Sequence, residues 1–143
     1  MSDYSLTASH IKHLNRTGRA HGIAGATITA GQVLYADTAD AEKLKIADAN
    51  SATAAVRAVK GIALHGASAG QPLAYAITGA RVRLTTGSAV GAFNATVILS
   101  TNAGNMAPHS DDASGTYKTI LGTLDSTGKI LTVAITTSGG VTP

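Results

Sequence analysis

The stretch GQPLAYAITGARV, residues 70–82, occurs a second time in altered form as GKILTVAITTSGGV, residues 128–141. Both copies begin with a glycine, reach a leucine three residues later (Leu73 and Leu131) and contain the tripeptide Ala-Ile-Thr. A glycine permits the positive φ of a tight turn, and the apolar, β-branched run after it is typical of a β-strand. The two stretches therefore predict two equivalent strands, each entered through a short turn.

The repeat extends upstream of these strands. Without a gap, KIADANSATAAVRAVKG (residues 45–61) aligns with MAPHSDDASGTYKTILG (residues 106–122), which places Gly61 on Gly122. The identities are few and rich in alanine, but the loop lengths and the alternation of apolar residues agree as well. The sequence thus predicts an internal duplication or a pseudo-symmetric pair of β-units.

Still further upstream, Val33-Leu34 aligns with Val97-Ile98. Each half then reads as a strand, a polar loop, a strand that ends near a glycine, a short turn and an apolar strand. We place the two pseudo-repeated units at about residues 31–82 and 95–141.

Short apolar runs separated by Gly, Asn, Asp or Ser continue through most of the chain, as in all-β sandwiches and barrels. The predicted strands are 27–28, 32–35, 44–47, 55–64, 73–78, 81–85, 95–100, 117–124 and 130–136. Residues 39–46 and 50–59 contain helix formers, but the first has room for one helical turn and not for a long helix. We therefore expect an all-β chain, a small β-sandwich or barrel over residues 25–143.

Residues 1–24 differ from the rest, because Lys12, Arg16 and Arg19 face a single acid, Asp3. The apolar residues of this segment are Leu6, Ile11 and Leu14, with little else beside them. We judge them too sparse to bury a core and predict an extended N-terminal arm. Its three cations suit an acidic partner surface, although an untethered terminus that happens to be basic is an equal alternative.

The composition restricts the classes of function. The 143 residues fit one domain, and charged residues make up only 13% of them, so the surface suits contact with another protein. The net charge of +3 is spread without a basic block or interleaved aromatic residues, which argues against direct nucleic-acid binding. The sequence has no cysteine, no apolar signal-peptide core and no membrane-length apolar run, so we expect neither a disulfide nor secretion nor a membrane span.

Gly66-Ala67-Ser68-Ala69-Gly70 matches the nucleophile-elbow pattern G-x-S-x-G. That elbow is a strand-to-helix turn and is followed along the chain by an acid and then a histidine. Here the flanking residues predict a hairpin, the repeat has the plain turn Ser126-Thr127-Gly128 at the same place, and the order of acid and histidine fails. We therefore interpret Ser68 as a turn residue and expect no enzyme.

Two further groups of polar residues have simpler explanations than chemistry. His109, Asp111 and Asp112 lack a second cluster of ligands, so we interpret them as loop residues that cap turn amides and predict no metal or cofactor. Arg81 and Arg83 alternate onto one strand face, with Arg57 and Lys60 expected nearby. A solvated or subunit-facing strand accounts for these cations, and an acidic partner remains an alternative.

Three segments carry a resemblance to a known family. They are ITAGQVLY at residues 28–35, AVKGIAL at 58–64 and AGQP at 69–72. Their order resembles the small head decoration, or cement, proteins of tailed bacteriophages. The resemblance covers about residues 25–85 directly, the second half only through the repeat, and hardly touches the N-terminal arm.

The resemblance implies a β-module, often a homotrimer, made in the host cytoplasm and bound to the outer capsid surface, where it stabilises the expanded head. Its partner would be the major capsid protein, and no catalytic residue is implied. We expect Lys12, Arg16 and Arg19 to contact the capsid. The alternatives are a tail or baseplate component and, from another class, a glycan-binding β-sandwich, for which five aromatic residues without Trp offer little platform.

Overall fold

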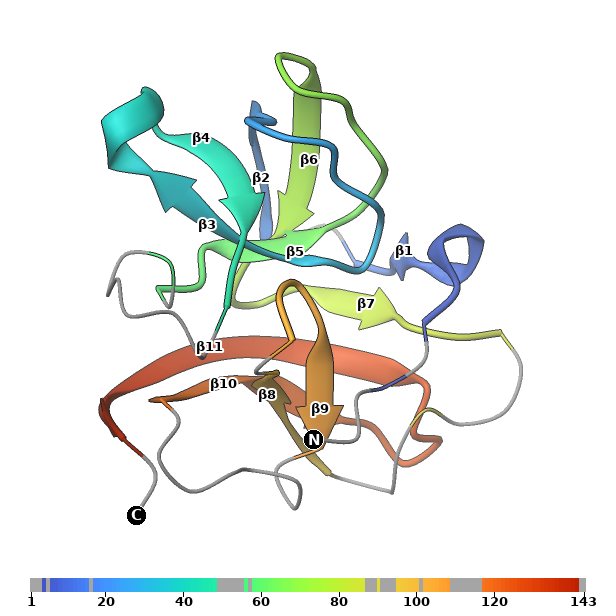
Figure 1. Cartoon of the computed structure of the whole chain (residues 1–143). Helices are drawn as coiled ribbons and strands as arrows, with labels where there is room; N and C mark the ends of the chain where they lie inside the picture. Colours follow the sequence, from blue (N-terminus) through green and yellow to red (C-terminus); the bar gives the residue numbers. More distant parts are fainter. Residues whose placement is uncertain are drawn as a thin grey trace.

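The computed structural model describes residues 4, 6–15, 17–48, 56, 58–86, 90, 95–100, 102–108 and 117–141, the last range without the side chains of 117–118 and 137–141. The chain is all-β, as predicted (Figure 1). Its strands are β1 (Lys12–His13), β2 (Arg19–Ile23), β3 (Val33–Asp37), β4 (Lys43–Ile46), β5 (Gly61–Ala63), β6 (Pro72–Ala76), β7 (Arg81–Arg83), β8 (Thr96–Leu99), β9 (Met106–Pro108), β10 (Tyr117–Leu124) and β11 (Ile130–Val141). Two 3₁₀ turns, η1 (Ala8–His10) and η2 (Thr38–Asp40), accompany them. Within the described ranges no helix is long and apolar enough to span a membrane.

Two antiparallel sheets contain all the strands. The five-stranded sheet has the order β2-β6-β5-β3-β4, and the six-stranded sheet has the order β1-β7-β11-β10-β8-β9. Apart from β1, the two sheets have the same strand order. With the five strands of each unit (β2–β6 and β7–β11) numbered along the chain, that order is first, fifth, fourth, second, third. The two pseudo-repeated units are thus confirmed. The predicted bounds need two corrections. The first unit begins earlier, at β2, and residues 81–82, which were assigned to the first unit, belong to β7 of the second, so the observed units run over residues 19–76 and 81–141.

The strand register agrees with the sequence repeat. In the hairpin of β3 and β4, Leu34 lies opposite Ile46, and in the hairpin of β8 and β9, Ile98 lies opposite Ala107. The alignment that sets Val33-Leu34 on Val97-Ile98 and residues 45–61 on 106–122 superposes these two pairs. The repeat therefore describes equivalent pairs of neighbours in space.

Gly61 and Gly122 occupy equivalent positions for the same steric reason. A Cβ on Gly61 would lie 2.4 Å from the carbonyl oxygen of Ala76, and a Cβ on Gly122 would lie 2.0 Å from that of Thr132. Gly122 has φ +152°, and the register of β10 shifts between it and Ile120 against both neighbouring strands, as at a β-bulge. In each unit the last strand pairs with the fourth, and at this glycine its backbone lies so close that a side chain does not fit.

Two cores divide the buried side chains. The larger core lies between the sheets and takes Val33, Ile62 and Ala76 from the five-stranded sheet. The smaller core lies inside that sheet and takes Leu34, Ala63 and Tyr75 from the same three strands. Because β3, β5 and β6 are buried on both faces, their sequences are continuous apolar runs without a polar alternation.

The five-stranded sheet curls into a small barrel. Ala24, just after β2, forms a parallel bridge with Leu44 of β4, and the amide of Gly25 donates to the Leu44 carbonyl oxygen at 2.8 Å. These contacts join the two edge strands, and Figure 1 shows the barrel above the six-stranded sheet. The prediction of a sandwich or a barrel is met by a barrel packed on a sheet.

Both Ala-Gly-Gln sequences form the same turn. In residues 29–32 and 68–71 the glycine has φ near +90° (Gly31 +89°, Gly70 +87°) and the glutamine Oε1 accepts from the amide of the first residue, at 2.9 and 2.8 Å. Ile28 and Ala67, which precede the two turns, pair with each other through two backbone hydrogen bonds. Pro72 follows the second turn and begins β6, a position at which the missing amide donor of proline is tolerated.

The N-terminal segment belongs to both sheets. β1 pairs with β7 and β2 pairs with β6, so residues 12–13 and 19–23 are extended but lie within the folded unit. Ile11 is only 8% exposed and packs in the larger core. The expectation that the apolar residues of this segment are too sparse to bury is wrong for Ile11, because one buried side chain beside a backbone-paired strand is enough to hold the segment.

Local predictions succeed where the pattern is strong. Of residues 39–46, where one helical turn was expected, only 39–40 belong to the 3₁₀ turn η2, and Lys43–Ile46 forms β4. The Asp37 carboxylate caps η2 by accepting from the Ala39 amide at 3.0 Å. β9 was not predicted, because Met106–Pro108 is short and ends in proline. Most of residues 50–59, where helix formers occur, lie outside the described residues.

Candidate functional site

The three cations assigned to the arm lie apart in the fold. Lys12 is exposed on β1, at the edge of the six-stranded sheet, and Arg19 is exposed on β2 of the barrel. Arg16 lies outside the described residues. The structure therefore does not place Lys12 and Arg19 together on one extended arm, because each lies on a different sheet.

Lys12 instead joins the two arginines of β7. Lys12 lies directly opposite Arg83, and Arg81 lies on the same face because Val82 between them points into the core. The Nε of Arg83 donates to the His10 carbonyl oxygen at 3.0 Å, which fixes the guanidinium at the β1 edge. The predicted alternation of Arg81 and Arg83 onto one face is thus observed, and β1 adds a third cation to it.

Threonines continue this face across the sheet. The registers of β8, β10, β11 and β7 place Thr96, Thr123, Thr132 and Arg81 in one row. Thr123, Thr132 and Arg81 are exposed, and Thr96 is half-buried. We call this row, together with Arg83 and Lys12, the threonine–arginine face.

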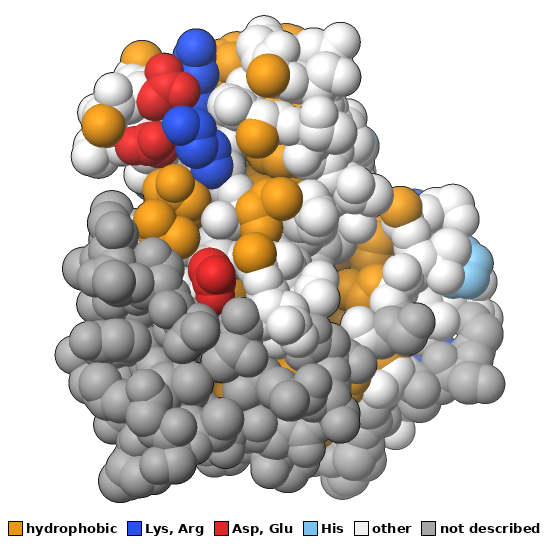
Figure 2. All heavy atoms as spheres, viewed as in Figure 1, with side chains coloured by type: hydrophobic (Ala, Val, Ile, Leu, Met, Phe, Trp, Pro, Cys, Tyr) orange, Lys and Arg blue, Asp and Glu red, His pale blue; other side chains and the backbone are white. Residues whose placement is uncertain are grey.

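The charges of the β3–β4 hairpin neutralise one another, unlike those of the threonine–arginine face. The ammonium of Lys45 lies 2.7 Å from the Asp37 carboxylate and 3.2 Å from that of Asp40, and Lys43 lies 3.8 Å from Asp40. Figure 2 shows these acidic and basic side chains together over the hairpin. The hydrogen bond from Lys45 holds the pKa of Asp37 below its ordinary value.

Asp125 lies in the turn between β10 and β11, and its carboxylate accepts hydrogen bonds from that turn and the start of β11. Its Oδ1 accepts from the hydroxyl of Thr127 at 2.7 Å and from the backbone amides of Thr127, Lys129 and Ile130 at 3.1 to 3.4 Å. These donors, the Thr127 hydroxyl first, lower the pKa of Asp125. Its carboxylate therefore organises the turn and forms no ion pair with a described cation.

An Asp125→Asn variant tests this role through its pH dependence. A depressed folded pKa means that the ionised carboxylate adds stability above the unfolded pKa of about 3.9, and that this stability is lost as pH falls through the folded value. We expect the melting temperature of Asp125→Asn to be lower than that of the wild type at pH 7, and the gap to close on acidification below about pH 4. A gap that stays constant from pH 7 to pH 2 would contradict this role.

The structure places Ser68 in the second Ala-Gly-Gln turn, which leads into strand β6 and not into a helix. The nearest histidine along the chain, His65, has both ring nitrogens engaged: Nε2 accepts from the Ala74 amide at 3.0 Å, and Nδ1 lies 2.9 Å from the Gly66 carbonyl oxygen. Acceptance at Nε2 fixes the tautomer with the proton on Nδ1. The site of Ser68 is a hairpin turn, as the sequence analysis interpreted it.

The other predicted polar groups are only partly described. His109, Asp111, Asp112 and Arg57 lie outside the described residues, and Lys60 is exposed beside the barrel. Within the described part of the chain, no three acidic or histidine side chains come close enough to hold a metal ion.

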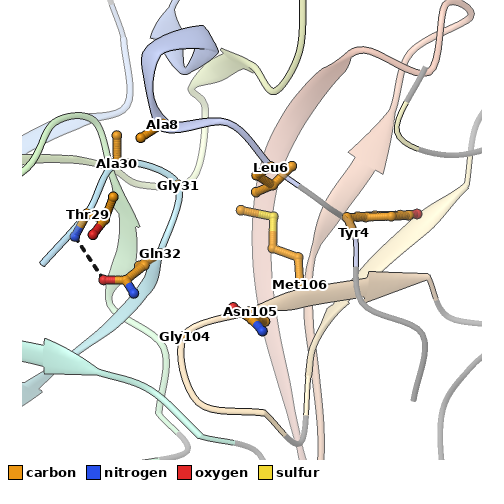
Figure 3. Close-up of a pocket in the computed structure, with 10 residues that line it drawn as sticks. All are labelled: Tyr4, Leu6, Ala8, Thr29, Ala30, Gly31, Gln32, Gly104, Asn105 and Met106. Carbon is orange, nitrogen blue, oxygen red and sulfur yellow. Dashed lines mark hydrogen bonds between the residues drawn. The ribbon is translucent and has the colours of Figure 1, made fainter. Parts of the chain in front are cut away.

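Among the cavities lined by described residues, two lie at junctions that were not foreseen from the sequence. One, of about 220 Å³, lies where the N-terminal segment passes the turns at Gly31 and Gly104 (Figure 3). The other, of about 320 Å³, lies between β2 and β4 where the barrel seam opens, with Glu42, Lys60 and Tyr75 in its wall. Burial of the Tyr75 ring, with the nearby Glu42, raises the pKa of its phenol. The Ala-Gly-Gln turn at residues 29–32 forms part of the first cavity, but both cavities are completed by segments far apart in the chain, which no local motif brings together.

The threonine–arginine face is therefore the candidate site. Of its six residues, the sequence predicted only that Arg81 and Arg83 share a face. Comparisons of the chain with protein-family models, with curated proteins and with solved structures found no match.

Proposed function

We propose that the chain is a virion structural protein that binds the outer surface of a tailed-phage capsid and stabilises the expanded head. The proposal starts from the resemblance of residues 28–35, 58–64 and 69–72 to head decoration proteins. The major capsid protein is then the partner, and a homotrimer is the expected assembly.

The observation that carries the proposal is that these three segments are neighbours in the barrel. The first contains an Ala-Gly-Gln turn and the start of β3, the second contains β5, and the third contains the other Ala-Gly-Gln sequence and the start of β6. The Lys60 amide donates to the Leu34 carbonyl oxygen at 2.7 Å, and the Ala63 amide donates to that of Gln32 at 2.9 Å. The three similar segments thus form one continuous structural unit, as a shared fold requires. This supports a family relationship more strongly than short matches dispersed over the structure would.

Stabilisation of the head follows from linkage. A protein that binds the expanded shell and not its precursor lowers the free energy of the expanded state by an amount that grows with its concentration over Kd. Because the shell offers many equivalent sites, modest contacts at each copy add up over the particle.

The test uses expanded heads and unexpanded precursors that lack this chain. We expect the purified protein to sediment with expanded heads to a saturating copy number, to leave precursors unbound and to raise the temperature at which heads release DNA. The assembly state of the free chain is measured by sedimentation equilibrium, for which we expect a trimer. Binding to isolated tails in place of heads would instead support the tail alternative, and binding to neither would contradict a virion role.

Removal of residues 1–22 is a poor test, although it would remove the predicted arm. It also deletes β1 and most of β2, together with the buried Ile11. Loss of binding by such a variant would report on folding, so substitutions on the intact chain are needed.

A further inference from the structure

We propose that the threonine–arginine face is the surface that docks onto the partner, and that the surface it meets is an acidic protein surface. This inference rests on the proposed function and adds to it the face that contacts the capsid and the charge of the contact.

The face has an ordered arrangement of polar groups. Thr123 lies directly opposite Thr96 on one side and Thr132 on the other, and Thr132 lies opposite Arg81. Threonine side chains on a strand are stiff at χ1, so little conformational entropy is lost when they are covered. Each hydroxyl can donate and accept a hydrogen bond, which suits contact with a protein surface.

Three cations occupy one end of the face. Arg83 lies between Lys12 of β1 and Ile130 of β11, and Arg81 lies two residues away on the same side of β7. Among the described residues, Arg83 hydrogen-bonds the His10 carbonyl oxygen through its Nε, so its terminal nitrogens can donate to an acceptor on a partner. A carboxylate is the group that such a guanidinium binds best, through two parallel hydrogen bonds.

The positive charge of this end is not neutralised within the described residues. The ion pairs among the described residues all lie elsewhere, in the β3–β4 region, where Lys43 and Lys45 pair with Asp37 and Asp40. Asp125, at the end of the neighbouring hairpin, directs its carboxylate to its own turn. Like charges placed side by side are unfavourable in the free protein, and an acidic partner relieves that repulsion when it binds.

The face favours an acidic protein over a nucleic acid. Single-stranded nucleic acids are bound by grooves that combine cations with aromatic stacking platforms. The residues of the face are threonine, lysine and arginine, without an aromatic ring. A polar row with cations at one end is suited to another protein surface with acids at the matching end.

The test compares Arg81→Glu with Lys60→Glu. Both residues are exposed and both variants change the net charge equally, but Lys60 lies beside the barrel and not on the face. We expect Arg81→Glu to weaken binding to expanded heads by about tenfold or more, because it places a like charge against the partner, and Lys60→Glu to change it by less than about twofold. Circular dichroism and thermal melting of both variants check that the fold is kept.

The outcomes separate this inference from the proposed function. If the wild type binds heads and Arg81→Glu binds equally well, the face is not the docking surface, while the proposed function stands. If the wild type does not bind heads, both are overturned. Tighter binding of the wild type to a duplex DNA oligonucleotide than to heads at the same salt concentration, abolished by Arg81→Glu, would assign the face to nucleic acid and overturn the acidic protein partner.

Discussion

A Gly122→Ala variant is expected to lose most of its folding stability or to fail to fold. An alanine Cβ would lie 2.0 Å from the Thr132 carbonyl oxygen, and that oxygen belongs to the backbone of β11, which cannot rotate away as a side chain can. The residue would also keep a φ of +152°, which side chains of L-amino acids rarely adopt. We expect a loss of about 4 kcal/mol or more in the free energy of unfolding, measured by chemical denaturation.

Gly70→Ala is the matched control for this substitution. Gly70 also has a positive φ, +87°, but a Cβ there would meet nothing within 4 Å. Its cost should be limited to the left-handed backbone, about 1 kcal/mol. If both variants lose the same stability, the positive φ alone explains why glycine is needed at these positions, and the close approach of the paired strands does not.

A Leu34→Ala variant is expected to lose about 2–5 kcal/mol of stability. Leu34 is fully buried in the smaller core, on a strand whose neighbouring residue Val33 fills the larger core. The space left by Leu34 cannot close easily, because β3 is held between two cores. The midpoint of urea unfolding should fall while the m value stays unchanged.

Ile23→Ala provides the comparison for Leu34→Ala. Ile23 is 41% exposed on β2, so its truncation should change the free energy of unfolding by no more than about 0.5 kcal/mol. Similar losses at the two positions would show that the interior of the barrel is not a packed core.

Much of the fold could be predicted because its repeat consists of short sequence motifs. Gly61 and Gly122, the Ala-Gly-Gln turns and the apolar runs of β3 and β6 are each visible in a short window. The missed strands lack such signals: β1 has two residues, and β2, with the sequence RAHGI, alternates weakly and contains a glycine. Their strand conformation depends on β7 and β6, which provide backbone partners that no local pattern reveals.

The candidate site shows the same limit more strongly. The alternation of Arg81 and Arg83 predicts that both share a face. It does not predict that Lys12 lies opposite Arg83, because seventy residues separate the two in the chain. The row of Thr96, Thr123 and Thr132 likewise depends on the registers of three strands and on the shift beside Gly122. Cations that were grouped by their proximity in sequence, Lys12 with Arg19, are separated because β1 and β2 enter different sheets.

The most direct measurement is a cryo-electron microscopy reconstruction of expanded heads incubated with the purified chain, beside heads without it. The account predicts additional density on the outer surface of the shell, into which the barrel and sheet fit with the threonine–arginine face toward the capsid. Identical reconstructions with and without the chain, at concentrations that saturate any binding seen by sedimentation, would contradict the proposed function.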